Sequence, residues 1–557
     1  MIKDMTRGLV SGRGSGGMSG GVFGSVVSAR LSAFTSRKSI NFPATITTVS
    51  LLAVLAGCAT NPVTGDRELN LISTQEQIAI GEQNYVPTQQ SQGGQYKVDA
   101  ELTRYVNEVG QRVAAYAPID LPYEFVVLNN SVPNAWALPG GKMAINRGLL
   151  YELETEAELA AVLGHEAVHA AARHGAQSME RGMLLQGALM ATTIAASNSD
   201  YAGYIVGGAQ VGAQLISQQY GRDAERESDL YGTRYMAQAG YDPQAAVSLQ
   251  ETFVRLSEGR QAGWLDGLFA SHPPSQERVA NNRQLVAQLR SEGFTNGEQG
   301  RERYQQMTQT LRETKPAYDA FDEAQRLASE GQLDEAEAQV DEAIRMFSRE
   351  ARFYGLKGNI ALNRRDYGEA IDLYNSAIAR DDGYYEYYLG RGLAYNERGN
   401  DRQARADLQA SNDLLPTALA SNELGGLALA ANDRSAAKSY FEQAASAPGQ
   451  IGQNAQQAYY RLEIQDNPGS AVQGGVYVDD QGRVILRLRN ASPVNLSQVT
   501  VQMQGILNGE AVSQPATIQN LAAGQTQDFN TGVQLAADGS QQLTNAQVIV
   551  QQAVVAN

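Results

Sequence analysis

The sequence of 557 residues contains only one cysteine, four histidines and two tryptophans. With one cysteine the chain can form no internal disulfide, so its stability depends on hydrophobic cores and on any bound metal. Basic residues are also few, with 44 Lys and Arg against 60 Asp and Glu, and the formal charge of −16 argues against nucleic acid as a partner. A chain of this length should divide into roughly three or four domains.

Residues 1–57 have the pattern of a bacterial lipoprotein signal segment. Two basic residues precede an apolar stretch over residues 42–55, and small residues then lead to Cys58. We therefore expect residues 1–57 to be cleaved and Cys58, the only cysteine, to carry a lipid. The alternative is an accidental apolar N-terminus with a buried cysteine. Ala59 and Thr60 follow in place of Asp, and this resemblance to sorted lipoproteins implies a lipid anchor in the outer membrane of a Gram-negative cell, facing the periplasm.

After a tether and first helix over residues 58–98, residues 99–315 are expected to combine helices with a small sheet. One apolar face over residues 102–116 predicts a scaffold helix. Three strand-like pieces predict an antiparallel sheet, and Pro139-Gly140-Gly141 marks a turn between the last two. The three pieces are residues 123–128, 134–138 and 142–146.

Two long helices should follow the sheet, one through His165 and one through Glu225. A Gly- and Ala-rich apolar stretch, residues 183–216, separates them and could be mistaken for a membrane hairpin. Polar residues at 197–200 interrupt it, and a membrane span needs about 20 predominantly apolar residues. We therefore expect packed helices in that stretch.

Small residues recur with a period of 34 between residues 318 and 448. Three sets of small residues follow this period, each starting at a different position in the repeat. They are Ala324, Gly358, Gly392 and Gly426; Ala336, Ala370, Ala404 and Ala437; and Ala343, Ala377 and Ala444, with Ser411 between the last two. A helix-turn-helix period of 34 residues resembles tetratricopeptide repeats, in which paired helices pack closely. We expect an all-α repeat domain over residues 316–450, although a bundle with coincidental spacing is the alternative.

The pattern of apolar and polar residues changes in the last part of the chain. After a predicted linker over residues 451–470, apolar and polar residues alternate, as in residues 483–489, with turn signals about every ten residues. This pattern predicts an all-β, sandwich-like domain over residues 471–557. Nothing in this domain suggests chemistry.

The chemistry of the chain is predicted to reside in an H-E-x-x-H motif, from His165 to His169. Two histidines four apart project from one face of a helix and can reach one zinc, while Glu166 between them can reach the attacking water. A capping box at Thr155 and Glu158 supports a helix here, and Gly175 predicts its end. The alternative is a surface helix with coincidental histidines.

The third protein ligand is expected to be Glu225. It lies four residues before Asp229, so both carboxylates share one face of a second helix. Glu225 can bind the zinc while Asp229 accepts a hydrogen bond from a ligand histidine. His174 lies nine residues after His165, about half a turn around the helix, and is expected to point away.

These motifs resemble the zinc peptidases related to HtpX and to the type 1 CAAX prenyl protease. H-E-x-x-H followed by E-x-x-[AS]-D carries the resemblance, and the lipobox, the segment at residues 61–65 and the repeats resemble the periplasmic BepA-like branch. Ser228 stands where the family usually has Ala. The resemblance implies a zincin-type (gluzincin) α+β peptidase domain. It also implies an edge strand at Asn134, Ala135, Trp136 and Ala137 that pairs with extended substrates.

The function implied is a zinc endopeptidase, with one Zn²⁺ per chain, that cleaves unfolded or misassembled envelope proteins. Glu166 is expected to act as general base on water that zinc activates. The repeats could recruit clients or dock the outer-membrane assembly machinery, with Tyr384, Tyr385, Tyr387 and Tyr388 as possible anchors. The alternative function is a repeat scaffold whose metal site is latent or structural.

His272 is a further candidate site residue. It lies in Ser271-His272-Pro273-Pro274 and is the one remaining histidine free to approach the metal from outside the first helix. We expect it near the open coordination position, where it could cap a resting enzyme or stabilise the oxyanion. The alternative is a histidine packed in a loop between two helices.

Overall fold

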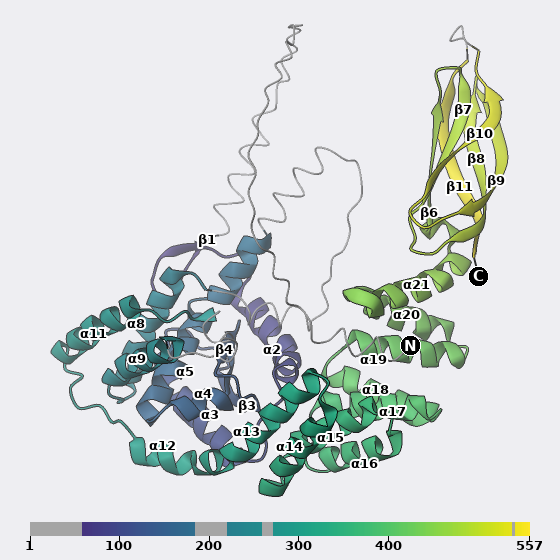
Figure 1. Ribbon diagram of the computed structural model, residues 1–557. Coiled ribbons are helices and arrows are strands. Elements are labelled where there is room, and N and C mark those ends of the chain that lie inside the picture. Colours follow the sequence, from purple (N-terminus) through teal and green to yellow (C-terminus); the bar gives the residue numbers. More distant parts are fainter. Residues whose placement is uncertain (1–57, 184–219, 259–270, 537–540, 557) are drawn as a thin grey trace, which may run out of the picture. The chain divides into compact units, whose positions relative to one another are not determined.

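The computed structural model describes residues 58–183, 220–258, 271–536 and 541–556 (Figure 1). The described residues form two compact units. One runs to Ile360 and includes Ser376–Tyr384, and the other takes Ala361–Asn375 together with the residues from Tyr385 onward. Residues 1–57, the predicted signal segment, lie outside the described residues.

The first unit contains a three-stranded sheet in the order β3-β5-β4. The strands are β3 (Glu124–Leu128), β4 (Ala135–Leu138) and β5 (Lys142–Asn146). The three predicted strands are confirmed, but the prediction of a purely antiparallel sheet is wrong, since β3 pairs with β5 in parallel. Strand β5 lies between β3 and β4. It pairs antiparallel with β4 and runs in the same direction as β3. This topology leaves β4 at an edge of the sheet.

The first unit also contains one short hairpin and a set of helices. They are the strands β1 (Cys58–Thr60) and β2 (Arg67–Leu69) and the helices α2 (Thr74–Ser91), α3 (Ala100–Ala114), α4 (Arg147–Glu152), α5 (Glu156–Ala171), α8 (Arg222–Gln238), α9 (Gln244–Glu258), α11 (Gln276–Ser291) and α12 (Arg301–Met307). Within the described ranges, no helix combines the length and the hydropathy that a membrane crossing requires. The apolar stretch over residues 183–216, apart from Met183, lies outside them.

Helices α5 and α8 approach each other at a pair of glycines. A Cβ atom on Gly232 would lie 2.8 Å from the backbone nitrogen of His165. One on Gly164 would lie 2.9 Å from the carbonyl oxygen of Gly232. Because neither residue has a side chain, the helix of the H-E-x-x-H motif and the helix of Glu225 can touch through their backbones.

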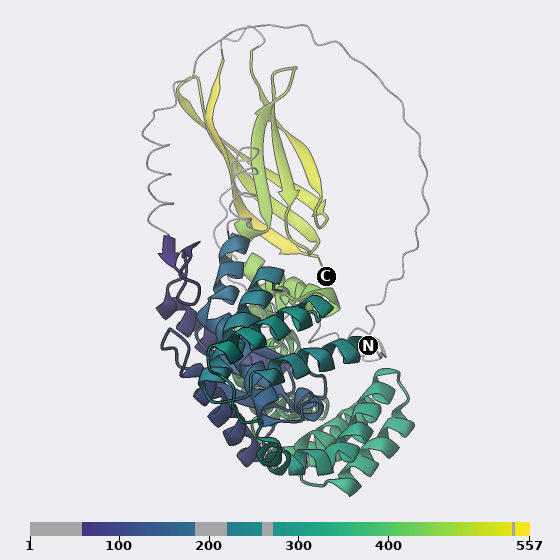
Figure 2. The ribbon, with the colours of Figure 1, turned by 90° about the vertical axis from the view of Figure 1, so that its left-hand side faces the viewer.

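The helix pairs that follow confirm the repeats. The helices are α13 (Gln309–Ser329), α14 (Leu333–Met346), α15 (Ala351–Asn363), α16 (Tyr367–Ile378), α17 (Tyr385–Glu397), α18 (Asp401–Leu414), α19 (Ala418–Ala430) and α20 (Arg434–Ala445), coloured teal to green in Figure 2. The four alanines of the second predicted set are fully buried. Two of the four tyrosines at 384–388 are also buried, namely Tyr384 and Tyr387.

One predicted packing position is wrong. Gly426 is exposed, with nothing within 4 Å of a Cβ added there, whereas a Cβ on Gly425 would lie 2.6 Å from the ring of Phe441. The last repeat is one residue shorter, as the spacing from Ala404 to Ala437 already shows. The small residue that permits close packing in this repeat is therefore Gly425.

The two ends of the repeat region differ from the predicted boundaries. The boundary at residues 315 and 316 falls inside α13, whose Tyr318 and Phe321 belong to the same hydrophobic core as Leu149 of α4. The predicted linker over residues 451–470 is largely the helix α21 (Gly449–Asp466). Ala455 and Leu462 of α21 pack with Phe441 of α20, so this segment covers the apolar end of the repeats.

The C-terminal residues form two three-stranded sheets, in the orders β10-β7-β6 and β11-β8-β9. The strands are β6 (Val472–Val478), β7 (Arg483–Asn490), β8 (Leu496–Leu507), β9 (Glu510–Leu521), β10 (Thr526–Gln534) and β11 (Leu543–Val555), the yellow-green arrows of Figure 1. Leu486 and Leu488 of one sheet share a hydrophobic core with Val499 and Val501 of the other. The all-β prediction is confirmed, and the sandwich arrangement stays a prediction.

Candidate metal centre

The H-E-x-x-H motif lies on α5, whose start follows the predicted capping box. The Thr155 side chain accepts from the backbone N–H of Glu158, and the Glu158 carboxylate accepts from the backbone N–H of Thr155. One turn of helix separates His165 from His169, so both rings project from the same face, with their Nε2 atoms 3.1 Å apart. Two imidazole nitrogens are thereby directed at one point.

Glu225 and His272 complete a compact cluster around that point. The carboxylate oxygens of Glu225, from α8, lie 3.5 Å from His165 Nε2 and 3.3 Å from His169 Nε2. His272 Nδ1 lies 3.0 Å from Glu225 Oε1. One potential ligand atom from each of the four residues lies within 4.8 Å of the others. Three imidazoles and one carboxylate, all buried, form a donor set that suits zinc.

Glu166 lies beside the cluster and is not part of the ligand set. Its side chain is buried, and its Oε1 atom is 3.5 Å from His272 Nε2. Among the described residues its Oε2 atom has no hydrogen-bond partner. Burial raises the pKa of Glu166, although His272 and His165 oppose this shift. A carboxyl group with a raised pKa and a free oxygen is suited to exchange a proton with a small molecule near the cluster.

Asp229 and Arg278 lie behind the His165 ring. Asp229 Oδ1 lies 3.1 Å from His165 Nδ1, the ring nitrogen that faces away from the cluster. The Arg278 guanidinium donates twice to Asp229, each time at 2.7 Å, and also lies 2.9 Å from Glu225. Burial opposes ionisation of Asp229, but Arg278 holds its pKa below the usual value. Sequence reasoning missed Arg278, which follows Asp229 by 49 residues and carries no local motif.

The two histidines of the H-E-x-x-H motif differ in their affinity for a proton. Burial tends to lower the pKa of both rings. Glu225 and Asp229 overcome this tendency at His165 and raise its pKa to about 10, whereas the pKa of His169 stays well below its usual value. A proton in the cluster is therefore held at His165, and a metal must displace it.

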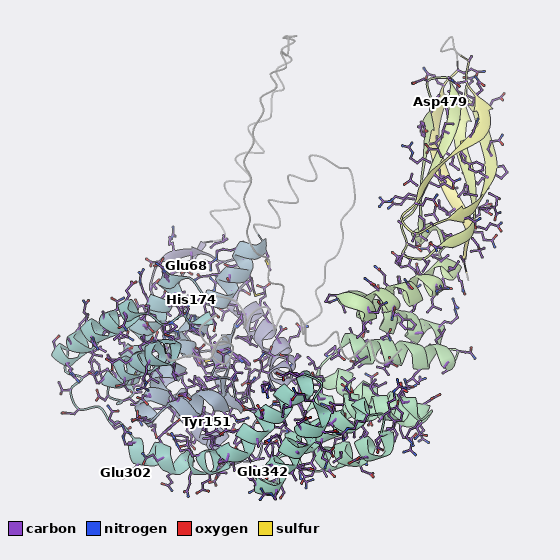
Figure 3. The ribbon with its side chains drawn as sticks, in the orientation of Figure 1. Glu68, Tyr151, His174, Glu302, Glu342 and Asp479 are labelled. Atoms are coloured by element: carbon purple, nitrogen blue, oxygen red, sulfur yellow. The ribbon has the colours of Figure 1, made fainter. Side chains whose placement is uncertain are left out.

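The prediction for His174 is wrong. Helix α5 ends at Ala171, and Arg173 adopts a left-handed conformation with φ of 63°, so the predicted stop at Gly175 lies inside the next helical segment, residues 174–183. A helical-wheel angle no longer applies across this break. His174, which is labelled in Figure 3, is buried. Its Nδ1 atom lies 2.9 Å from Nδ1 of His169.

Tyr220 is a second residue that sequence reasoning missed. Its ring stacks on the His169 ring, with 4.0 Å between centroids and 29° between planes. The signal that could have identified it is its position two residues before the helix that carries Glu225. Stacking restricts the rotation of the His169 ring.

The predicted edge-strand residues are divided between two environments. Ala135 lines a cavity of about 30 Å³ together with His165 and Glu166. Trp136 points into a different cluster, where it meets Tyr85 edge to face at 6.2 Å. Asn134 precedes β4, and Ala137 is buried within it. The structure thus brings one of these four residues to the metal cluster.

The segment that follows Cys58 contacts the end of α5. In the β1–β2 hairpin Cys58 pairs with Leu69. The Asn61 side chain donates to the carbonyl oxygen of Ala172, 3.4 Å away. Arg173 donates to the carbonyl oxygen of Ile72 at 3.0 Å and to Glu180 at 2.8 Å. The left-handed turn after α5 is therefore held by the N-terminal segment.

Comparison with known proteins finds similarity to two families over parts of the chain. Residues 100–286 match peptidase family M48, and residues 321–385 match the tetratricopeptide repeat family. The chain is similar to the beta-barrel assembly-enhancing protease of Escherichia coli (28% identity, covering 34% of this chain and 40% of the relative). It is also similar to the mitochondrial metalloendopeptidase OMA1 of Schizosaccharomyces pombe (30% identity, 39% of this chain and 63% of the relative).

These matches are partial. The matched region spans about two fifths of the length of the beta-barrel assembly-enhancing protease. Among solved structures, the tetratricopeptide protein YrrB is 21% identical, over 29% of this chain and 84% of that one, with a TM-score of 0.25. A TM-score of 0.25 is too low to support a conclusion about the fold or the function of this chain. The similarity to the two families covers residues 100–286 and 321–385.

Proposed function

Because the chain contains a peptidase family M48 domain followed by tetratricopeptide repeats, we propose that it is a zinc-dependent endopeptidase. The observation that carries this proposal is the buried cluster of His165, His169, Glu225 and His272 with the free carboxylate oxygen of Glu166 beside it. Its relatives are named proteases and metalloendopeptidases. We further propose the gluzincin arrangement, in which the third ligand is the glutamate of a second helix.

His165, His169 and Glu225 would hold the zinc, which supplies a Lewis acid that lowers the pKa of a water and polarises the scissile carbonyl. Glu166 accepts the proton of the attacking water and delivers it to the leaving amine. Its burial favours this role, since a raised pKa brings the carboxyl group closer to the operating pH. Asp229, fixed by Arg278, orients the His165 ring.

His272 accounts for a resting state. Its Nδ1 atom lies 3.0 Å from Glu225 Oε1 and 3.4 Å from His165 Nε2, and these distances support a place at the coordination position that a water or substrate would take. Of the two roles predicted for it, the capping role fits this geometry better than oxyanion stabilisation. A segment carrying His272 must therefore withdraw before peptide hydrolysis.

We propose polypeptides of the cell envelope as substrates, in an unfolded or misassembled state. The name of the assembly-enhancing relatives supports this class, as do the repeats, which are surfaces for protein contacts. The edge strand β4 could add a substrate strand by backbone pairing, with Ala135 nearest the cluster. A lipid on Cys58 would anchor the protein to the outer membrane on its periplasmic side.

The test compares wild type with Glu166→Gln. We expect the variant to retain stoichiometric zinc and to lose casein cleavage by about a thousandfold or more, because Glu166 is a base and not a ligand. Glu251→Gln is the matched control, since Glu251 lies on α9 and, among the described residues, pairs with the exposed Arg283. Retained cleavage in Glu166→Gln would rule out the mechanism.

A second function has one observation in its favour. Structural zinc sites are closed by four protein ligands, and this cluster offers four. The chain could then be a repeat scaffold whose metal site is structural or latent. His272→Ala separates the two functions: an opened catalytic site retains zinc and cleaves peptide, whereas a structural site loses stability and gains no activity.

A further inference from the structure

The ring of His169 can bind a metal through one nitrogen only. Its Nε2 atom faces the cluster, 3.1 Å from His165 Nε2 and 3.3 Å from Glu225. If Nε2 is the ligand atom, Nδ1 carries the ring hydrogen and needs an acceptor. The atom that meets Nδ1 is Nδ1 of His174, 2.9 Å away.

We propose that His174 is a positioning residue for the metal ligand His169, accepting the hydrogen bond that fixes its tautomer and ring orientation. The proposal rests on the proposed zinc site and adds a residue to it. His174 itself is not a ligand, because its Nδ1 atom faces the distal side of the His169 ring. The ring hydrogen of His174 then resides on its Nε2 atom, which points toward Glu227.

Glu227 completes a chain of three side chains. Its Oε1 atom lies 3.6 Å from His174 Nε2 and is buried without a hydrogen-bond partner among the described residues. A buried carboxylate oxygen without a partner is costly, and a small rotation would bring it within hydrogen-bonding distance of Nε2. This carboxylate selects the His174 tautomer that leaves Nδ1 as an acceptor.

The backbone places His174 where this contact needs it. Had α5 continued past Ala171, residue 174 would lie half a turn away from His165. The left-handed Arg173 turns the chain instead, at an energetic cost for a residue with a side chain. Its guanidinium is buried against the carbonyl oxygen of Ile72 and the carboxylate of Glu180, and these contacts offset that cost.

The two ligand histidines are therefore supported differently. His165 faces a carboxylate, Asp229, whose charge is balanced by Arg278. His169 faces the imidazole of His174, and its ring is held on one side by Tyr220. An imidazole acceptor orients the ring without the negative charge that another carboxylate would add to a cluster that already holds Glu225, Glu166 and Asp229.

The experiment measures zinc affinity by competition with a chelator on the full chain. His174→Asn places a carbonyl oxygen close to the position of Nδ1, whereas His174→Leu has similar bulk and no acceptor. We expect the dissociation constant to rise about 10–100-fold for His174→Leu and to stay within about threefold for His174→Asn. With Co²⁺ as a probe, the visible absorption spectrum of His174→Asn should match wild type.

The outcomes are decisive even if one variant fails to fold. Equal losses of zinc affinity in His174→Asn and His174→Leu would show that His174 acts through packing. Unchanged zinc affinity in both variants would show that His174 has no role in zinc binding. Either result overturns the inference. If His174→Leu does not fold, a loss of more than about tenfold in His174→Asn alone overturns it. Failure of the proposed function looks different, because wild type would then bind zinc weakly or cleave nothing.

Discussion

Arg278→Gln tests whether the buried charges of the site balance one another in the metal-free protein. The guanidinium contacts Asp229 at 2.7 Å and Glu225 at 2.9 Å. Without zinc, these carboxylates have Arg278 and a proton on His165 as counter-charges. With zinc bound to Glu225, the metal supplies part of that balance. We therefore expect the substitution to destabilise the metal-free protein more than the zinc-loaded protein.

The magnitude follows from the cost of an uncompensated buried charge. Removing one partner of a buried ion pair costs about 3–5 kcal/mol. For a domain of this size each kcal/mol lowers Tm by about 2–4 °C, so the metal-free domain should lose roughly 6–20 °C. The zinc-loaded domain should lose clearly less, and the gap in Tm between the two states should widen.

Thermal unfolding with excess zinc and with excess chelator measures both losses. Arg283→Gln is the matched control, because Arg283 lies on the same helix, is 63% exposed and pairs with Glu251; such a surface pair contributes only about 0–1 kcal/mol. Adding Asp229→Asn to Arg278→Gln should recover part of the metal-free loss, since it removes an unbalanced charge. Equal losses in the two states would refute the charge-balance reasoning.

Three further predictions concern the ligands and the helix contact. Glu225→Ala should lose stoichiometric zinc in metal analysis, whereas Asp229→Ala should weaken zinc binding by about 10–100-fold, as expected for a partner of a ligand. His272→Ala should retain zinc and increase the rate of cleavage of a short peptide; an unchanged rate would favour a packing role for His272. Gly232→Ala should reduce zinc affinity, because the added Cβ would separate α8 from α5. This is expected even though a change from Gly to Ala within a helix usually stabilises the protein by about 0.5–1 kcal/mol. Unchanged zinc affinity in chelator competition would contradict the prediction.

The parts of the site that the sequence predicts are those in which spacing along one helix determines geometry. His165, Glu166 and His169 lie on α5, and a period of 3.6 residues is enough to bring the two imidazoles together. Arg278 could not be predicted, because its contact with Asp229 depends on how α8 and α11 pack. Nothing near Arg278 in the sequence distinguishes it from the exposed arginines of the chain.

The error at His174 shows how a local rule fails. The helical wheel assumed that α5 continued to Gly175, the residue that most easily adopts a left-handed conformation. Arg173 adopts that conformation instead, because Ile72 and Glu180 bind its side chain. These partners are distant in sequence or lie beyond the turn, so propensity alone selects the wrong residue. The sheet is a similar case, since pairing of β3 with β5 is decided by topology and not by strand pattern.

The first repeat helices cannot be treated as a detachable arm. Arg147, at the start of α4, is fully buried, donates to Asn129 at 2.9 Å and lies 3.7 Å from the ring of Tyr318 in α13. Glu350 accepts from Asn129 and from Tyr318.

Asn129 begins the loop that leads from β3 to the edge strand β4. Arg352 donates to its carbonyl oxygen, so side chains of the repeat region fix the start of that loop. A chain cut within α13 would leave Arg147 buried without its aromatic partner and would open the shared core. Loss of peptide cleavage after such a cut would therefore report damage to the peptidase core and could not be assigned to client recruitment. Recruitment is better tested by substitutions on the surface of the repeats beyond Tyr385, which belong to the other compact unit.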